Sequence, residues 1–245
     1  MGCFTTKLGS RFLRFKNARN YDEFAQAQNW AAKSLVSLIE TFRGEFGLVY
    51  EIGCGSGLLT KVLLERLEIE HLSLNDLYES QIMNGFHSQI GDICEIEMPK
   101  GLDLVVSSSV FQWIDPLEVL AFRIKQALKK GGICAFAMLS KGSLHELSSY
   151  TKQGLNYLAP EQIEHIFSKY FDVLAMRTSS YISQFNSLKE LLASLKETGV
   201  NNIKGSFVLN KASLAGLEAH FNGAYELSYN SVSYTHLTLP TTCQV

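Results

Sequence analysis

Hydrophobic and polar positions along the chain follow two periods in turn, one typical of helices and one typical of strands. An apolar pattern with helical spacing covers 21–42, and a strand-like run, "GLVYEIG", follows at 47–53. The elements expected next are a helix after residue 57, a strand at 71–76, a short helix before "SQIGDI" at 88–93, a strand at 102–109, a helix over 116–130 and a strand at 132–139. Strands that alternate with helices predict a parallel, doubly wound sheet of the α/β class.

After residue 140 the order of elements changes. A helical pattern is expected over 141–170, a long β-rich run at 171–185, further helices over 186–222 and a last strand from 224. We expect these later helices to lie as a lid over the ends of the strands, and the last two β segments to form an antiparallel edge of the sheet. No repeat, linker or low-complexity tract divides the chain, so we predict a single domain over 1–231.

The composition is that of a folded globular protein, and it argues against several classes. The 22 cationic and 24 acidic side chains give a net charge of −2, so nothing global favours nucleic acid. No apolar run approaches the roughly 20 residues that a membrane span needs. Five cysteines lie far apart without a C-x-x-C pair, which predicts a reducing, cytoplasmic compartment. The histidines show no ligand spacing, so no metal site is expected.

A glycine-rich turn follows the first strand and carries the clearest chemical signal. It has the pattern Glu51-x-Gly53-x-Gly55-x-Gly57 and opens a helix, the place where an open α/β sheet binds its ligand. In a dinucleotide fingerprint the third glycine would stand one position later than it does here. An acid, Asp76, ends the next strand and can accept hydrogen bonds from two ribose hydroxyls. Together these features favour an adenosyl ligand that has no pyrophosphate.

This turn and three later motifs resemble those of the class I S-adenosylmethionine-dependent methyltransferases. The later motifs are "GDI" at 91–93, "DLVVSSSVFQW" at 103–113 and "ALKKGGICAF" at 127–136. The resemblance implies a seven-stranded, mostly parallel, Rossmann-like sheet with an antiparallel edge strand, entrance helices in 1–42 and a donor-binding core over 46–140. It also implies S-adenosylmethionine as the cofactor, without a metal. The donor-binding residues that it implies are Glu51, Gly53, Cys54, Gly55, Asp76, Leu77, Asp92, Ile93 and Ser107.

Outside this core the chain resembles the malonyl-acyl-carrier-protein O-methyltransferases of biotin synthesis. The segments that carry the resemblance are "RFLRFKNARNYDEFAQAQ" at 11–28, "SSVFQW" at 108–113, "GSLHEL" at 142–147, "SLKETGVNN" at 194–202 and "LNKASLAGLEAHF" at 209–221. It implies methyl transfer to the free carboxylate of a malonyl thioester. The candidate substrate residues are Tyr21, Gln112, Trp113 and Lys141. The cation that binds the carboxylate stays open between Lys141 and Arg177.

A basic cluster near the start of the chain gains a meaning from this resemblance. Residues 1–20 contain five cations and no acid, and an acyl carrier protein is acidic, so Arg11, Arg14, Lys16 and Arg19 are expected to steer its approach. The alternative for these cations is a solvated helix face. Two alternatives also remain for the activity: an O-methyltransferase of another small carboxylate or small molecule, and a noncatalytic binding module on the same fold.

The end of the chain, "VSYTHLTLPTTCQV" at 232–245, does not continue as an ordinary last strand should. Threonines, a proline and a lone cysteine follow the alternating residues. The peptide "VSYTHL" is also one reading frame of a transposon-end adaptor used to prepare sequencing libraries. We therefore interpret 232–245 as a non-native tail, and we expect it to be poorly packed and the edge strand to be shortened.

Overall fold

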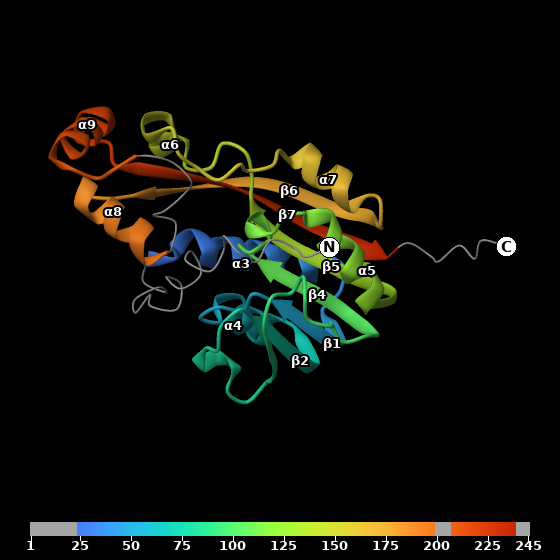
Figure 1. Cartoon of the computed structure of the whole chain (residues 1–245). Helices are drawn as coiled ribbons and strands as arrows, with labels where there is room; N and C mark the ends of the chain where they lie inside the picture. Colours follow the sequence, from blue (N-terminus) through green and yellow to red (C-terminus); the bar gives the residue numbers. More distant parts are fainter. Residues whose placement is uncertain (1–23, 199–206, 239–245) are drawn as a thin grey trace.

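One mixed β-sheet organises the part of the chain that the computed structural model describes, residues 24–198 and 207–238 (Figure 1). Its seven strands lie in the order β3-β2-β1-β4-β5-β7-β6. Their bounds are β1 Glu45–Ile52, β2 Glu68–Asp76, β3 His87–Ile90, β4 Leu102–Ser108, β5 Leu128–Leu139, β6 Phe171–Gln184 and β7 Glu226–Thr238. The first five strands pair in parallel, and β7 is antiparallel to both of its neighbours. The predicted doubly wound, mostly parallel sheet is confirmed.

The register of the central strands brings their carboxyl ends to one edge of the sheet. Ile52 at the end of β1 pairs with Asn75 near the end of β2, and Glu51 pairs with Val106 of β4. The end of β4 in turn lies beside β5, where Ser108 pairs with Ala137. Segments that leave β1, β2, β4 and β5 therefore meet at this edge, which is where an open α/β sheet holds its ligand.

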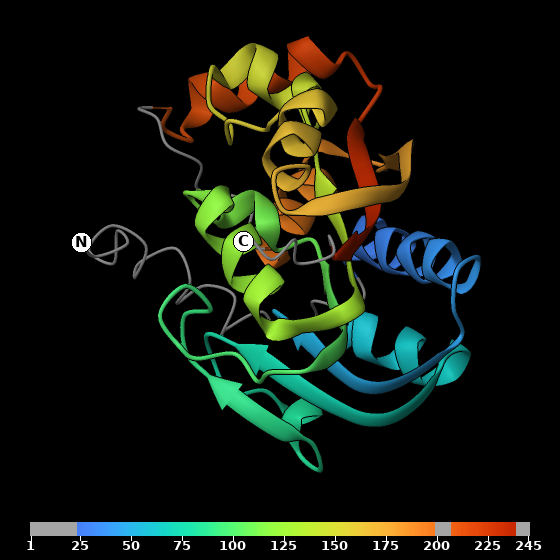
Figure 2. The ribbon, with the colours of Figure 1, turned by 90° about the vertical axis from the view of Figure 1, so that its right-hand side faces the viewer.

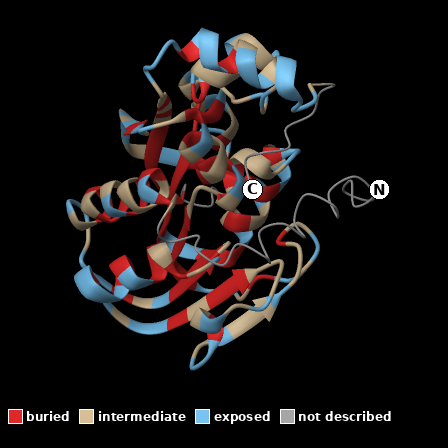
Figure 3. Cartoon of the chain, turned by 90° about the vertical axis from the view of Figure 1, so that its left-hand side faces the viewer, coloured by how far each residue is buried: buried red, intermediate tan, exposed pale blue. Residues whose placement is uncertain are grey.

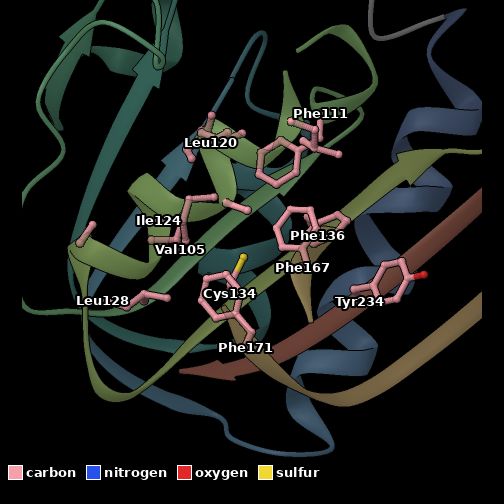
Figure 4. Close-up of a cluster of buried hydrophobic side chains, with 14 of the residues drawn as sticks. Val105, Phe111, Leu120, Ile124, Leu128, Cys134, Phe136, Phe167, Phe171 and Tyr234 are labelled. Atoms are coloured by element: carbon pink, nitrogen blue, oxygen red, sulfur yellow. The ribbon is translucent and has the colours of Figure 1, made fainter. Parts of the chain in front are cut away.

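Helices cover both faces of the sheet, because successive strand residues point to opposite sides. On one face α3 (Gln26–Glu40) and α4 (Leu58–Arg66) pack against alternate apolar residues of β1, β2, β4 and β5. On the other face α5 (Leu117–Ala127) and α7 (Pro160–Phe167) enclose a second core that is rich in aromatic rings. Figure 2 shows α3 and α4 on the side of the sheet opposite to α5, and Figure 4 shows the aromatic core. No described helix is long and apolar enough to cross a membrane.

A third apolar cluster, which we call the lid cluster, lies beyond the carboxyl end of β5 (Figure 1). The helices α6 (His145–Thr151), α8 (Leu188–Glu197) and α9 (Lys211–Phe221) gather there. Its buried residues are Ala27, Leu139, Leu144, Leu188, Leu191, Leu195, Leu217, Phe221, Leu227 and Tyr229. The lid expected from 186–222 therefore has its own small core, apart from the segment 199–206, which lies outside the described residues.

The helical pattern expected over 141–170 is two short helices with a connection between them. Helix α6 ends at Thr151, where Lys152 caps it in a left-handed conformation with φ of 54°, and α7 starts only at Pro160. Moreover, α7 buries Ile163 and Phe167 in the aromatic core and so covers the sheet. A left-handed residue at 152 and the proline that starts α7 separate the two helices. The role of 141–170 as lid helices stays a prediction.

The expectation of a poorly packed tail was wrong for residues 232–238, while the shortening of the strand relative to the natural enzyme stays a prediction. Strand β7 continues to Thr238 and is an inner strand, paired with β5 on one side and with β6 on the other. Figure 3 shows the buried interior of the sheet, and every residue of 231–236 is buried. Side-chain alternation explains how the strand fits between two cores. Val232 and Tyr234 point into the aromatic core, while Ser233 between them faces the opposite side of the sheet. Residues 239–245 lie outside the described part.

Candidate active site

The glycine turn between β1 and α4 is held by the end of β2. The backbone N–H groups of Gly53 and Cys54 both donate to the carbonyl oxygen of Asn75, at 2.8 and 2.9 Å. Gly53 has a φ of +73°, and a Cβ on it would meet Val110 Cγ2 at 2.3 Å, so both the backbone and the packing require glycine. Gly57, with a φ of +87°, must be glycine for the same two reasons, because a Cβ on it would clash with Ile82. The turn is therefore fixed from two sides.

Gly55, at the tip of the turn, differs from its neighbours because the space beside it is open. Its φ is +52°, and a Cβ built there would have no atom within 4 Å. Its N–H donates to Oδ2 of Asp76 at 2.8 Å. A ligand can thus approach the backbone at Gly55 closely, while Gly53 and Gly57 fix the turn beneath it.

Glu51, just before the turn, is a buried carboxyl with one unused oxygen. It is 1% exposed, and its Oε2 accepts a hydrogen bond from the Thr60 hydroxyl at 2.8 Å. Its Oε1 is buried and has no hydrogen-bond partner in the described residues. Burial raises the pKa of Glu51 to about 8, against the opposing effect of the Thr60 hydrogen bond, and nearby Asp76 adds to the rise. Such an orphan acceptor is suited to a positively charged donor group of a ligand.

Asp76 ends β2 opposite the turn. Its Oδ2 is the acceptor for Gly55, and its Oδ1 accepts from the N–H of Tyr78 at 3.2 Å. Burial raises the pKa of Asp76, and these backbone hydrogen bonds oppose the rise. Each carboxylate oxygen keeps a further lone pair for a ligand hydroxyl. Leu77 follows directly and is half-buried.

Three other residues predicted for donor binding have structural contacts of their own. Asp92 is half-buried and accepts from the N–H of Cys94 at 2.8 Å, which shapes the loop after β3. Ile93 is 5% exposed and belongs to the aromatic core. Ser107 is fully buried and donates its hydroxyl to the carbonyl of Ile52 at 2.8 Å, so it ties β4 to the end of β1. Their roles toward a ligand stay predictions.

Cys54 within the turn is not a nucleophile. Its side chain is buried, and its Sγ lies 4.0 Å from the Ser80 hydroxyl. Burial raises the pKa of the Cys54 thiol to about 12, and the nearby carboxyls of Glu51 and Asp76 add to the rise. The thiolate is therefore absent near neutral pH, and Cys54 serves as a small residue of the turn.

The end of β4 presents two orphan polar atoms next to a strained residue. Ser109 has a φ of 62°, a left-handed conformation that a non-glycine residue seldom adopts. Its carbonyl accepts from Gln112 Nε2 at 2.7 Å, while Gln112 Oε1 and Ser108 Oγ are buried without a partner in the described residues. Gln112 and the half-buried Trp113 lie on a 3-10 turn, η3 (Phe111–Trp113). Strain and unpaired polar atoms together are typical of a functional site.

The other predicted substrate residues are exposed or lie outside the described part of the chain. Lys141 follows β5 with an exposed side chain, and Arg177 is exposed on β6. Tyr21 and the basic cluster Arg11, Arg14, Lys16 and Arg19 lie outside the described residues. Within the described residues, no group of three or more His, Cys, Asp or Glu side chains could hold a metal ion.

Sequence reasoning missed Asn75, which holds the site together. Besides accepting from the glycine turn, it donates from Nδ2 to the carbonyls of Gln89 and Gly91, at 3.0 and 3.1 Å. Asn75 thus holds the turn after β1 through its backbone carbonyl and the end of β3 through its buried side chain. Its position directly before the strand-end acid was the only available signal, and its partners become visible only in the folded sheet.

The arrangement fits S-adenosylmethionine. The orphan oxygen of Glu51 can accept from an ammonium group, the open side of Gly55 admits a ligand against the backbone, and Asp76 can accept from ribose hydroxyls. A pyrophosphate is less suited to this place, because the two carboxyl groups beside the turn, Glu51 and Asp76, would repel it. The fit agrees with the ligand expected from the sequence.

Comparison with known proteins covers this site and most of the chain. A family model described as a methyltransferase domain matches residues 50–136, from the end of β1 into β5. The malonyl-acyl-carrier-protein O-methyltransferase of Chlorobium phaeovibrioides is 34% identical over 207 residues, which covers 78% of this chain and 80% of that protein. The enzyme of the same name from Acinetobacter baylyi is 31% identical over 235 residues, covering 89% of this chain and 92% of that one.

Solved structures support the fold independently of close sequence likeness. The YcgJ protein of Bacillus subtilis superposes with a TM-score of 0.62 at 12% identity, over 84% of this chain and 98% of that one. The two sequence relatives go further, because their identity of 31 to 34% extends over more than three quarters of each chain. The chain therefore belongs to the malonyl-acyl-carrier-protein O-methyltransferase family.

Proposed function

We propose that the protein transfers the methyl group of S-adenosylmethionine to the free carboxylate of a malonyl group carried by acyl carrier protein. The observation that carries this proposal is the match to enzymes of that name over most of the chain. The intact donor turn supports it, because Glu51, Gly55 and Asp76 keep the side chains and open space that the donor needs.

The chemistry places few demands on the protein. The donor supplies an electrophilic methyl group on a sulfonium, and a malonyl carboxylate is already ionised at neutral pH, so no general base is needed. The protein must align the two reactants and exclude water. Gln112 and Trp113 at the end of β4, Lys141 after β5, and Tyr21 are the side chains proposed to contact the acceptor.

A methyl-transfer assay with three acceptors tests this proposal. The donor carries a labelled methyl group, and the acceptors are malonyl-loaded carrier protein, malonyl-coenzyme A and free malonate. We expect label on the two thioesters, with the carrier protein preferred, and little on free malonate. Label on malonate alone would indicate a small-carboxylate methyltransferase, and the absence of both donor binding and label would indicate a binding module.

The basic cluster near the start of the chain is proposed to steer the acidic carrier protein. Reversing the charges of Arg11, Arg14 and Arg19 to Glu should raise the KM for malonyl-loaded carrier protein and flatten its salt dependence, because steering acts through long-range charge. Turnover of malonyl-coenzyme A should stay nearly unchanged.

Charge reversal at three dispersed, exposed lysines, Lys33, Lys130 and Lys189, is the matched control for this experiment. It changes the net charge of the chain equally, so it should affect the carrier-protein KM far less. Equal losses in the two triple variants would contradict a local docking role for the basic cluster.

A further inference from the structure

Tyr157 lies on the lid cluster, and the residue after it packs on the aromatic core. It belongs to the connection between α6 and α7, and the next residue, Leu158, accepts a hydrogen bond from the N–H of Lys141 at 2.9 Å. Leu158 packs on the aromatic core, as do Val110 and Ile114 of the segment between β4 and α5. Tyr157 itself packs against the lid cluster. The connection therefore packs on the lid cluster through Tyr157 and, through Leu158, on the same aromatic core that the segment around Gln112 packs on.

The hydroxyl of Tyr157 is buried and has no hydrogen-bond partner in the described residues. Burial raises the pKa of this phenol, and nearby Tyr229 adds to the rise, so the group stays neutral and keeps its proton. A buried hydroxyl without a partner costs free energy, and phenylalanine would fill the same space without that cost. Another buried tyrosine shows the usual solution, because Tyr234 donates to the carbonyl of Pro160 at 2.7 Å.

An unpaired donor at this position calls for a ligand that is an acceptor. A malonyl carboxylate has two oxygens, and only one of them attacks the donor methyl, so the other is free to accept a hydrogen bond. Hydrogen bonds to an ionised group are stronger than those between neutral groups. The exposed Lys141 side chain, by contrast, has water as a competing partner.

We propose that the Tyr157 hydroxyl donates a hydrogen bond to the carboxylate of the bound acceptor and selects malonyl over uncharged acyl groups. This proposal rests on the proposed function. It assigns the role of carboxylate recognition to a neutral donor that packs on the lid cluster. This donor stands one residue before Leu158, whose carbonyl accepts from the N–H of Lys141. The lid would then complete the acceptor site when it packs against the core.

The test compares Tyr157→Phe with the wild-type protein in the presence of S-adenosylhomocysteine. Calorimetry measures binding of malonyl-loaded and acetyl-loaded carrier protein, two ligands that differ by the carboxylate. We expect the wild-type protein to prefer the malonyl form, and the variant to bind the malonyl form roughly tenfold more weakly with its affinity for the acetyl form unchanged. Its affinity for S-adenosylmethionine should also stay the same, and its thermal midpoint should be equal or higher.

Tyr234→Phe is the matched control, because it removes a buried phenol hydroxyl that already has a partner. It should lower the thermal midpoint and leave the preference for the malonyl form intact. If Tyr157→Phe retains the full preference, the role of Tyr157 is disproved while the proposed function stands. If the wild-type protein itself shows no preference, the substrate assignment has failed, and the proposal fails with it.

Discussion

Acidification from pH 6.5 to pH 4 should destabilise the protein through His236 in β7. This ring is fully buried among Phe136, Phe167, Phe171 and Tyr234, with ring centroids 5.1 to 5.9 Å away. Neither ring nitrogen has a hydrogen-bond partner in the described residues. Burial lowers the pKa of His236 to about 4 from 6.5, and the nearby backbone of Cys134 opposes this shift.

The sign of this effect follows from proton binding. Between pH 4 and pH 6.5 the unfolded chain binds the proton and the folded protein does not, so the free energy of unfolding falls as the pH falls. The full loss through this group is about 3 kcal/mol, since each pKa unit corresponds to about 1.4 kcal/mol. Glu51 acts in the opposite direction, because its raised pKa lets the folded state keep a proton that the unfolded chain releases.

Denaturant unfolding of the wild-type protein and of His236→Phe, measured from pH 7 to pH 4, checks this prediction. The difference between the two removes the contribution of Glu51 and of every other group that titrates equally in both. It should grow in favour of the variant as the pH falls. A difference between the two proteins that stays constant with pH would show that the His236 ring is not buried as described.

The second large effect concerns Gly55. Replacing it with Ala should weaken S-adenosylmethionine binding roughly tenfold or more, equivalent to about 1.4 kcal/mol, because a methyl group would occupy the open space beside the turn. The positive φ of +52° should also cost about 1 kcal/mol of stability. Calorimetric titration with the donor and thermal unfolding measure the two effects separately.

Gly85 provides the control for this experiment. It is exposed like Gly55, has a φ of +94°, and a Cβ there would also meet nothing within 4 Å. Gly85→Ala should therefore lose a similar amount of stability and keep its affinity for the donor. If both variants lose affinity equally, strain in the backbone and not occupation of the donor site would be responsible.

How much the sequence predicts depends on whether the partners of a residue are local. The spacing of Gly53, Gly55 and Asp76 was enough to predict a turn, a strand end and an adenosyl ligand, because glycine turns and strand-end acids follow short-range rules. Asn75 and Tyr157 could not be recognised in this way. The contacts of Asn75 cross three strands, and Tyr157 stands out only because its hydroxyl is buried without a partner.

The end of the chain shows the opposite kind of error. Alternation of Val232, Tyr234 and His236 was visible in the sequence, yet the threonines, the proline and the lone cysteine argued against an ordinary last strand. In the structure, residues 231–237 pair with a strand on each side. Several of their polar atoms are buried without a partner in the described residues: Ser231 Oγ, Thr235 Oγ1 and both ring nitrogens of His236. The composition thus indicated a cost in stability, which is different from a lack of order. That residues 232–245 are non-native stays a prediction. Resequencing the source gene tests it, and an uninterrupted natural reading frame through Val245 would contradict it.

The central claim is that the methyl group ends on the malonyl carboxylate, and mass spectrometry of the carrier-protein product tests it most directly. After incubation with S-adenosylmethionine, the malonyl-pantetheine group should gain the mass of one methyl, and fragmentation should release that methyl as methanol from the terminal ester. Acetyl-loaded carrier protein should gain nothing. A methyl group located on the central carbon of the malonyl unit, or one that also appears on the acetyl form, would contradict carboxyl methylation.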